Sequence, residues 1–236
     1  MAKRDNLPST SSRAEVDAFL RKVAVAPAAR PSGRPGRLIF ALDATASRQP
    51  TWDQASQIQA DMFRGTAALG GLEIQLVHYG GLGEFNASPW LTRSADLLAR
   101  MSAVSCRSGT TQIGKLLRHA LGQTRRAKVD AVVFVGDCME ESIQRLSDLA
   151  GQLGLLGVPV FLFHEGRDGE AARAFREIAR LTNGAYCRFD SQSAQQLRDL
   201  LGAVAVYAAG GRPALEDYGR RKGGTVLQIT HQLARK

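Results

Sequence analysis

The chain has 236 residues, of which 44% are hydrophobic and 22% charged, a composition typical of a globular domain rather than a disordered or fibrous protein. No apolar run is long enough to span a membrane, and the N-terminal stretch MAKRDNLPSTSS lacks the apolar core of a secretory signal, which predicts a cytoplasmic protein. Cys106, Cys138 and Cys187 form no CxxC pair and are typical of reduced thiols rather than of a disulfide or zinc framework.

The net charge of +9 is concentrated at the two ends of the chain. Residues 1–36 hold seven Lys or Arg against three acidic residues, and residues 208–236 hold six against two. The 37–207 segment between them carries 18 against 17 and is nearly neutral. Because a nucleic-acid-binding fold more often has a basic stripe on its body, nucleic acid is not the expected partner. The basic ends are interpreted as solvated tails or as contacts for an acidic partner.

The first segment in chain order, residues 1–36, is predicted to be a basic arm that precedes the folded body. Residues 12–23 begin with the spacing of a capping box and carry one apolar stripe, which indicates a short amphipathic helix. Prolines at positions 27, 31 and 35 then indicate a linker. The apolar stripe is expected to pack on the protein's own body or on a partner.

Residues 37–207 alternate strand-like and helix-like segments. Strands are expected at 37–43, 72–79, 84–90, 130–137, 158–165 and 185–190, and helices at 51–68, 94–104, 112–126, 141–153, 169–182 and 193–207. Several strands are continuous apolar runs, as in parallel strands covered on both faces. Gly80, Gly81 and Gly83 separate the second and third strands too closely for a helix, which indicates an antiparallel hairpin. The prediction is an α/β domain with a doubly wound, mostly parallel six-stranded sheet, one antiparallel edge strand and helices on both faces.

Residues 208–236 are predicted to be a basic C-terminal extension. The stretch GGRPALEDYGRRKGG is typical of a loop, whereas TVLQITHQL places Leu227, Ile229 and Leu233 on one face at strand spacing. A disordered tail does not need such a pattern, so the segment is expected to be ordered against the sheet edge or against a partner.

Two of the predicted strands end in an aspartate, Asp43 after the first and Asp137 after the fourth. Ligands of doubly wound sheets bind at the carboxyl ends of the strands, where the strand order reverses, so both carboxylates face one crevice if these strands are neighbours there. Thr45 and Ser47 follow Asp43, and the loop SGTTQIGK brings Thr111 to the same edge. Carboxylate and hydroxyl oxygens suit Mg²⁺ or a similar divalent cation, with Mn²⁺ and Ca²⁺ as alternatives.

The stretch DATAS (43–47), Thr111 within GTTQIGKLLRHAL and Asp137 within VVFVGD resemble the metal-ion-dependent adhesion site (MIDAS) of von Willebrand factor A (VWA) domains. The pattern of that family is Asp-x-Ser-x-Ser, then a Thr, then an Asp, on a doubly wound fold. The resemblance covers about residues 37–207. Three motifs in the family's order and fold context are far more specific than the first motif alone, which turn-capping residues also produce.

The resemblance implies a role for each residue of the pattern. Thr45, Ser47 and Thr111 offer hydroxyls to a metal ion, while Asp43 and Asp137 bind it directly or through water. The chain departs from the family at Thr45, where Ser is usual, and in having Gly-Asp-Cys after the fourth strand, where Thr-Asp-Gly is common. The first departure keeps the hydroxyl and the second keeps the aspartate but alters the loop.

The resemblance also implies a function. It predicts a non-enzymatic intracellular protein-binding module in which an acidic side chain of a partner displaces exchangeable water from the metal ion. Partners expected from the family are AAA+ ATPases or other components of a bacterial-type assembly, and the sequence itself identifies none.

The alternative hypothesis is a Mg²⁺-dependent phosphatase of the haloacid-dehalogenase type with Asp43 as nucleophile, because that family also has an acidic motif similar to GDCMEE (136–141). That family places a general acid two residues after the nucleophile, and here the position is Thr45. A phosphate-binding P-loop is rejected because Leu116 follows GTTQIGK where the motif requires Ser or Thr. Cys138 is interpreted as a small buried residue rather than a redox centre.

Overall fold

The computed structural model describes residues 34–45, 49–66, 71–81, 83–189 and 194–222. The predicted N-terminal helix, Ser47 and the TVLQITHQL segment therefore lie outside the described residues. The strands are β1 (Gly36–Asp43), β2 (Leu72–Gly80), β3 (Glu84–Ala87), β4 (Ala131–Gly136), β5 (Val160–Glu165) and β6 (Ala185–Phe189). The helices are α2 (Gln49–Thr66), α3 (Ser94–Ser102), α4 (Ile113–Arg126), α5 (Ile143–Leu155), α6 (Gly169–Leu181) and α7 (Ala194–Lys222).

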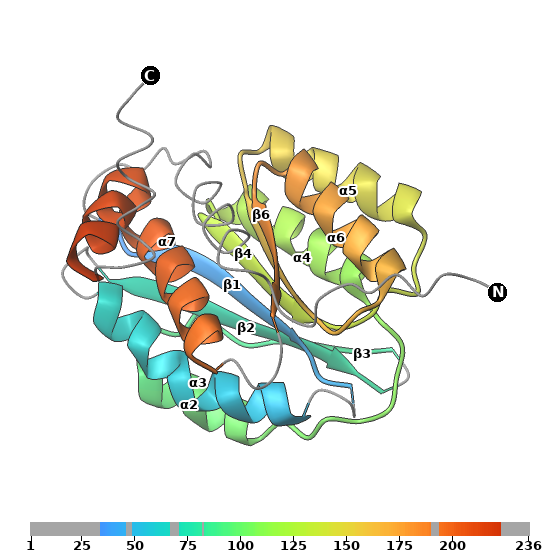
Figure 1. Cartoon of the computed structure of the whole chain (residues 1–236), viewed down its shortest axis with the longest axis horizontal. Coiled ribbons are helices and arrows are strands. Elements are labelled where there is room, and N and C mark those ends of the chain that lie inside the picture. Colours follow the sequence, from blue (N-terminus) through green and yellow to red (C-terminus); the bar gives the residue numbers. More distant parts are fainter. Residues whose placement is uncertain (1–33, 46–48, 67–70, 82, 190–193, 223–236) are drawn as a thin grey trace.

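The six strands form one sheet in the order β3-β2-β1-β4-β5-β6 (Figure 1). All neighbouring strands are parallel except β3, which pairs antiparallel with β2 at the edge. The predicted doubly wound sheet with one antiparallel edge strand is therefore confirmed. The strand order reverses between β1 and β4, which are direct neighbours, as the argument for a site at their carboxyl ends required.

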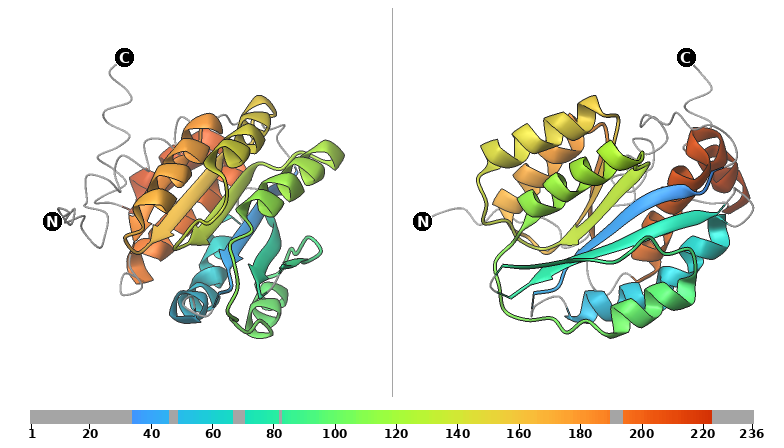
Figure 2. Two further views of the ribbon diagram at one scale, coloured as in Figure 1. Left: turned by 90° about the vertical axis from the view of Figure 1, so that its right-hand side faces the viewer. Right: turned by 180° about the vertical axis from the view of Figure 1, so that it is seen from behind.

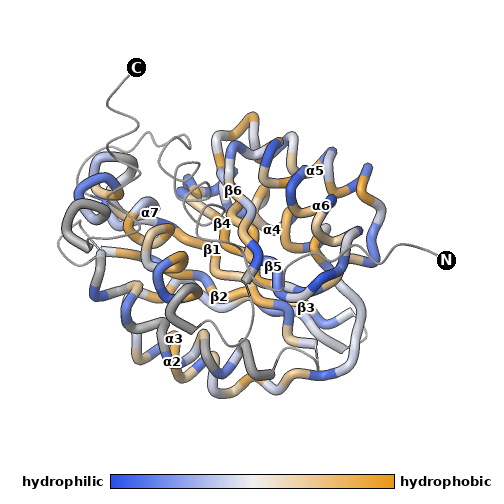
Figure 3. The backbone as a smooth tube through the Cα atoms, viewed as in Figure 1, coloured by the Kyte–Doolittle hydropathy of each residue, from blue (hydrophilic) through white to orange (hydrophobic). Residues whose placement is uncertain are grey.

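Helices cover both faces of the sheet, with α2, α3 and α7 on one side and α4, α5 and α6 on the other (Figures 1 and 2). Side chains alternate along β1, so Leu38, Phe40 and Leu42 join the first core while Ile39 and Ala41 join the second. Because both of its faces are buried, the strand is apolar from Leu38 to Leu42 rather than alternating with polar residues. Figure 3 shows the same contrast, with apolar residues concentrated in the strands and polar residues spread over the helices.

Helix α7 is longer than the sequence predicts. It runs to Lys222, and only Gly211, with φ of 67°, departs from helical geometry. Glycine reaches this left-handed conformation at little cost, and Pro213 lies in the first turn after the kink, where a missing N–H breaks no helical hydrogen bond. The prediction of a loop between residues 208 and 222 is therefore wrong. Neither α7 nor any other helix of the described residues is long and apolar enough to cross a membrane.

Candidate metal centre

The carboxyl ends of β1 and β4 bring three potential metal ligands together. Asp43 ends β1, and Asp137 directly follows β4. One carboxylate oxygen from each and the Sγ atom of Cys138 all lie within 4.8 Å of one another. The structure thus brings the two predicted aspartates together and adds Cys138, for which the sequence predicts only a buried structural role. Cys138 is half-buried and carries a free thiol.

The loop after β1 holds the first aspartate in a fixed orientation. Asp43 is 2% exposed, and its Oδ1 accepts a hydrogen bond of 2.8 Å from the backbone N–H of Thr45. Ala44 donates its N–H to the carbonyl of Tyr79 at 2.8 Å and accepts one from the N–H of Arg107 at 2.9 Å. The loop is therefore attached to β2 on one side and to the segment after α3 on the other. Thr45 is buried beside Asp43.

Two glutamates of the GDCMEE stretch attach the loop after β4 to the start of α4. Thr111 donates its N–H to Oε2 of Glu140 at 3.1 Å, and its Oγ1 accepts the N–H of Glu140 at 3.1 Å. The carboxylate of Glu141 accepts the N–H groups of Ile113 at 2.5 Å and Gly114 at 3.0 Å. Glu141 thereby caps a helix that has no side-chain cap of its own. Thr111 is thus placed against the loop that carries the second aspartate.

The surroundings of the three ligands carry an excess of negative charge. Burial, and then the charge of Asp137, raise the pKa of the Cys138 thiol to about 12. Burial also raises the pKa of Tyr79 well above its ordinary value, and Asp43, Glu141, Cys138 and Asp137 add to this rise. The Tyr79 hydroxyl is buried and has no hydrogen-bond partner among the described residues, which is unusual for a buried phenol.

A divalent cation fits this arrangement on two grounds. Its charge would offset that of the clustered acids, and water carried by the ion would offer a partner to the Tyr79 hydroxyl. Carboxylates and hydroxyls are the oxygen ligands that such ions take in proteins. The residues present therefore fit a metal ion, and the fit rests on the donor set and on one buried hydroxyl.

His164, on the neighbouring strand β5, holds the backbone of the second aspartate, a role that the sequence pattern does not predict. Its Nε2 lies 3.1 Å from the carbonyl oxygen of Asp137 and its Nδ1 lies 2.8 Å from the hydroxyl of Tyr186. Burial lowers the pKa of His164 to about 4, so the ring is neutral at neutral pH. In the tautomer that satisfies both contacts, Nε2–H donates to Asp137 and Nδ1 accepts from Tyr186. The available signal was a histidine at the end of the apolar run of β5.

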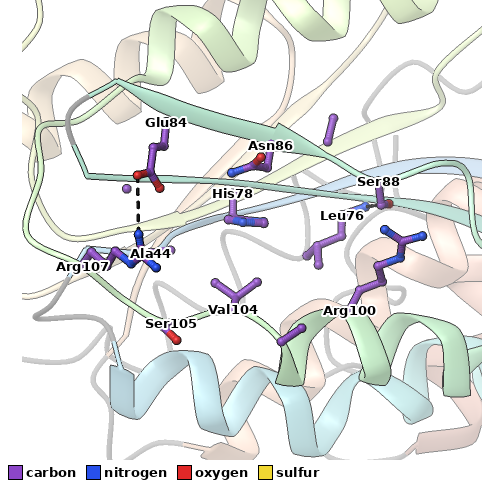
Figure 4. A pocket seen from close by; sticks show the side chains of 13 residues that line it. Ala44, Leu76, His78, Glu84, Asn86, Ser88, Arg100, Val104, Ser105 and Arg107 are labelled. Carbon is purple, nitrogen blue, oxygen red and sulfur yellow. Dashed lines mark hydrogen bonds and ion pairs between the residues drawn. The ribbon is translucent and has the colours of Figure 1, made fainter.

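A pocket of about 390 Å³ opens beside the candidate metal centre, between the β2–β3 hairpin and the segment after α3 (Figure 4). Ala44, the residue after the first aspartate, is part of its lining. Arg107 Nη1 lies 3.7 Å from Glu84 Oε1 at one end, Arg100 lies toward the other, and His78 projects between them. Burial lowers the pKa of His78, which leaves two arginines and one glutamate as the charges of the lining. The pocket is thus net positive.

The fold and the position of this site define the class: the chain has the fold of a VWA domain, which confirms the resemblance at the level of the fold. No protein-family model matches the chain, and no curated protein matches it. The SpRpn10 VWA domain superposes with a TM-score of 0.56 at 13% identity over 71% of this chain and 94% of that one.

Two further structures agree. Proximal thread matrix protein 1 (PTMP1) from the mussel byssus, described with a zinc-occupied MIDAS motif, gives a TM-score of 0.59 at 15% identity over 74% of this chain and 46% of that one. The ArnB paralog VWA2 from Sulfolobus acidocaldarius gives 0.51 at 13% identity over 75% of this chain and 47% of that one. This chain therefore spans less than half the length of both. Identities this low establish the fold alone.

Proposed function

We propose that this protein is a non-enzymatic, intracellular binding module that captures an acidic side chain of a partner protein through a bound divalent cation. The observation that carries the proposal is the meeting of two carboxylates within 4.8 Å of each other at the switch point of a VWA-like sheet. The cation would be held by the predicted site residues Asp43, Thr45, Ser47, Thr111 and Asp137.

The chemistry follows from the charge balance of the site. Two carboxylates offset the charge of a divalent ion, while hydroxyls fill further positions without adding negative charge, so the ion stays electrophilic toward an incoming carboxylate. Mg²⁺ is the ion that such oxygen ligands favour. The chain's own contribution is to hold Asp43 and Asp137 in place through the hydrogen bonds to Thr45 and His164.

The surface beside the site suits an acidic partner. Arg100 and Arg107 lie in the neighbouring pocket, and their charges would attract a negatively charged segment that approaches the ion. AAA+ ATPases and other assembly components remain the partner classes that the family resemblance suggests.

The phosphatase alternative is not favoured. The position two residues after Asp43 is Thr45, whose N–H donates to the Asp43 carboxylate, so the general acid of that chemistry is missing there. SpRpn10, PTMP1 and VWA2, the structures compared above, share the VWA fold or carry a MIDAS motif.

Manganese relaxivity tests the proposal directly. Mn²⁺ bound to the protein should enhance the relaxation of water protons, because water exchanges on the ion. Addition of a short peptide with one aspartate should lower the enhancement by displacing that water, and the same peptide with asparagine should not. Asp43→Ala should abolish the enhancement, whereas Asp148→Ala, an exposed residue of α5, should leave it unchanged.

Two results would contradict the proposal. One is Mn²⁺ affinity that is equal in the parent and in a folded Asp43→Ala protein. The other is a bound ion whose water neither peptide displaces.

A further inference from the structure

Cys138 differs from the other two cysteines in where its side chain lies. Cys187 belongs to the core beneath α2, α3 and α7, and Cys106 packs against the same core. Cys138 is half-buried and, in the part of the chain that the structure describes, is a member of neither apolar core. Its Sγ atom instead lies within 4.8 Å of a carboxylate oxygen of both Asp43 and Asp137. Packing therefore does not account for a thiol at this position.

The backbone on both sides of the thiol is fixed. The carbonyl of Asp137 accepts from the His164 ring at 3.1 Å, and the N–H of Glu140 donates to the Thr111 hydroxyl at 3.1 Å. Between them, Met139 is 7% exposed and packs into the core beneath α4, α5 and α6. With both flanks held, the thiol stays at the carboxylates rather than turning away with a loose loop.

A second and independent observation indicates a missing ligand at this point. The Tyr79 hydroxyl is fully buried, lacks a hydrogen-bond partner among the described residues, and belongs to a residue that pairs with Asp43 across β1 and β2. Asp43, Asp137 and Glu141 are the acidic residues that act on it electrostatically. A buried hydroxyl in such a place normally donates to a neighbour or to an ordered water. A metal ion that carries water between the ligands would supply the partner that the described residues do not.

We propose that Cys138 is itself a metal ligand and that the site prefers Zn²⁺ to Mg²⁺. This inference rests on the proposed function. It replaces an ion bound only by oxygen ligands with an ion that also binds sulfur. Zinc takes thiolate at about 2.3 Å and carboxylate at about 2.0–2.2 Å, with three protein ligands and one open position in sites that exchange a ligand. Tetrahedral ligands at these lengths lie roughly 3.5 Å apart, so the 4.8 Å cluster needs a contraction on the order of 1 Å.

The open position keeps the proposed capture intact. As the Zn–S bond forms, the thiol proton leaves to solvent, and the two carboxylates and the thiolate occupy three of the four positions. The carboxylate of a partner then takes the fourth in exchange for water. Mg²⁺ gains nothing from sulfur because thiolate is a soft ligand and Mg²⁺ a hard ion. The selectivity between the two metals therefore depends on Cys138.

Cobalt spectroscopy tests the proposal in the full chain, because Co²⁺ substitutes for Zn²⁺ and shows a near-ultraviolet charge-transfer band only when thiolate is bound. Metal-free protein titrated with Co²⁺ should show the band in the parent and in Cys106→Ser, the matched control, and not in Cys138→Ser. When Zn²⁺ competes with bound Co²⁺, the Cys138→Ser variant should bind Zn²⁺ at least ~10-fold more weakly than the parent. This is the lower end of the loss seen when a residue that only hydrogen-bonds to a metal ligand is replaced. The affinity for Mg²⁺ should be unchanged.

The outcomes separate this inference from the proposed function. If Co²⁺ binds the parent protein without the thiolate charge-transfer band, Cys138 is not a ligand, and the proposed site with oxygen ligands alone is retained. Equal zinc affinity in the parent and in Cys138→Ser leads to the same conclusion. If neither Co²⁺, Zn²⁺ nor Mg²⁺ binds the parent, both proposals fall. Circular dichroism of each variant confirms that a lost band reflects a lost ligand and not a lost fold.

Discussion

Acid should destabilise the metal-free protein through His164. The side chain is 0% exposed, and its pKa is lowered from the ordinary 6.5 to about 4 by burial. Because the pKa is lower in the folded state, the unfolded chain binds more protons between these two values. The contribution of His164 to stability is therefore complete above about pH 6.5 and is lost progressively as the pH falls toward about 4.

The size of the effect follows from the two pKa values. A difference of one pKa unit corresponds to about 1.4 kcal/mol, so the fall from 6.5 to about 4 costs roughly 3 kcal/mol of unfolding free energy once the pH is below both. That is a large share of the ~5–15 kcal/mol by which natural domains are stable. The loss should be measurable by urea denaturation at a series of pH values with a chelator present.

A variant isolates the contribution of this one residue. His164→Gln should be less stable than the parent at neutral pH, because a neutral histidine donates to Asp137 and accepts from Tyr186. The stability difference between the two proteins should then shrink by roughly 3 kcal/mol between about pH 7 and pH 4. His78 and His119, whose pKa values burial also lowers, are present in both proteins and cancel. A difference that does not vary with pH would refute the reasoning.

Four further experiments have expected outcomes. Glu141→Ala should lower the unfolding free energy by about 1–2 kcal/mol in urea, the cost of a lost helix cap, and unchanged stability would contradict the capping role. Gly109→Ala should lower the melting temperature, because a Cβ there would lie 2.2 Å from the carbonyl oxygen of Gly81. Gly122→Ala, which meets nothing within 4 Å inside α4, should instead stabilise by up to about 1 kcal/mol. Phosphate esters should not turn over with Mg²⁺, and turnover that Asp43→Asn abolishes would overturn the non-enzymatic assignment.

The fold and the meeting of two carboxylates could be predicted because they depend on local patterns. Most strands are apolar runs with a helix-length segment after them, and the glycines after Tyr79 indicate the single antiparallel pair. Asp43 and Asp137 end two buried strands, and right-handed crossovers leave few ways to order those strands. The predicted roles of Thr45, Ser47 and Thr111 as ligands stay predictions, and Ser47 lies outside the described residues.

The supports of the site could not be predicted in this way. Glu140 reaches Thr111 across 29 residues and His164 reaches Asp137 across 27, and no periodicity in the chain encodes a side chain that bonds a distant backbone group. The two glutamates of the GDCMEE stretch therefore could not be assigned a supporting role from the sequence. The kink at Gly211 was missed for a different reason. A glycine pair before a proline is typical of a loop, and only the geometry of the following turn shows that the helix resumes.

The central position of β1 limits how this chain can change in length. Its alternate residues supply two separate cores, and its last residue is Asp43. One inserted or deleted residue between Gly36 and Asp43 would turn the side chains on one side of the change to the opposite face of the sheet. Both cores would then lose side chains that they pack against, or the Asp43 carboxylate would turn away from Asp137. Homologous chains should therefore vary freely in residue type within β1, among apolar side chains, while keeping its eight-residue length. Their insertions should gather in the connections at the opposite end of the sheet.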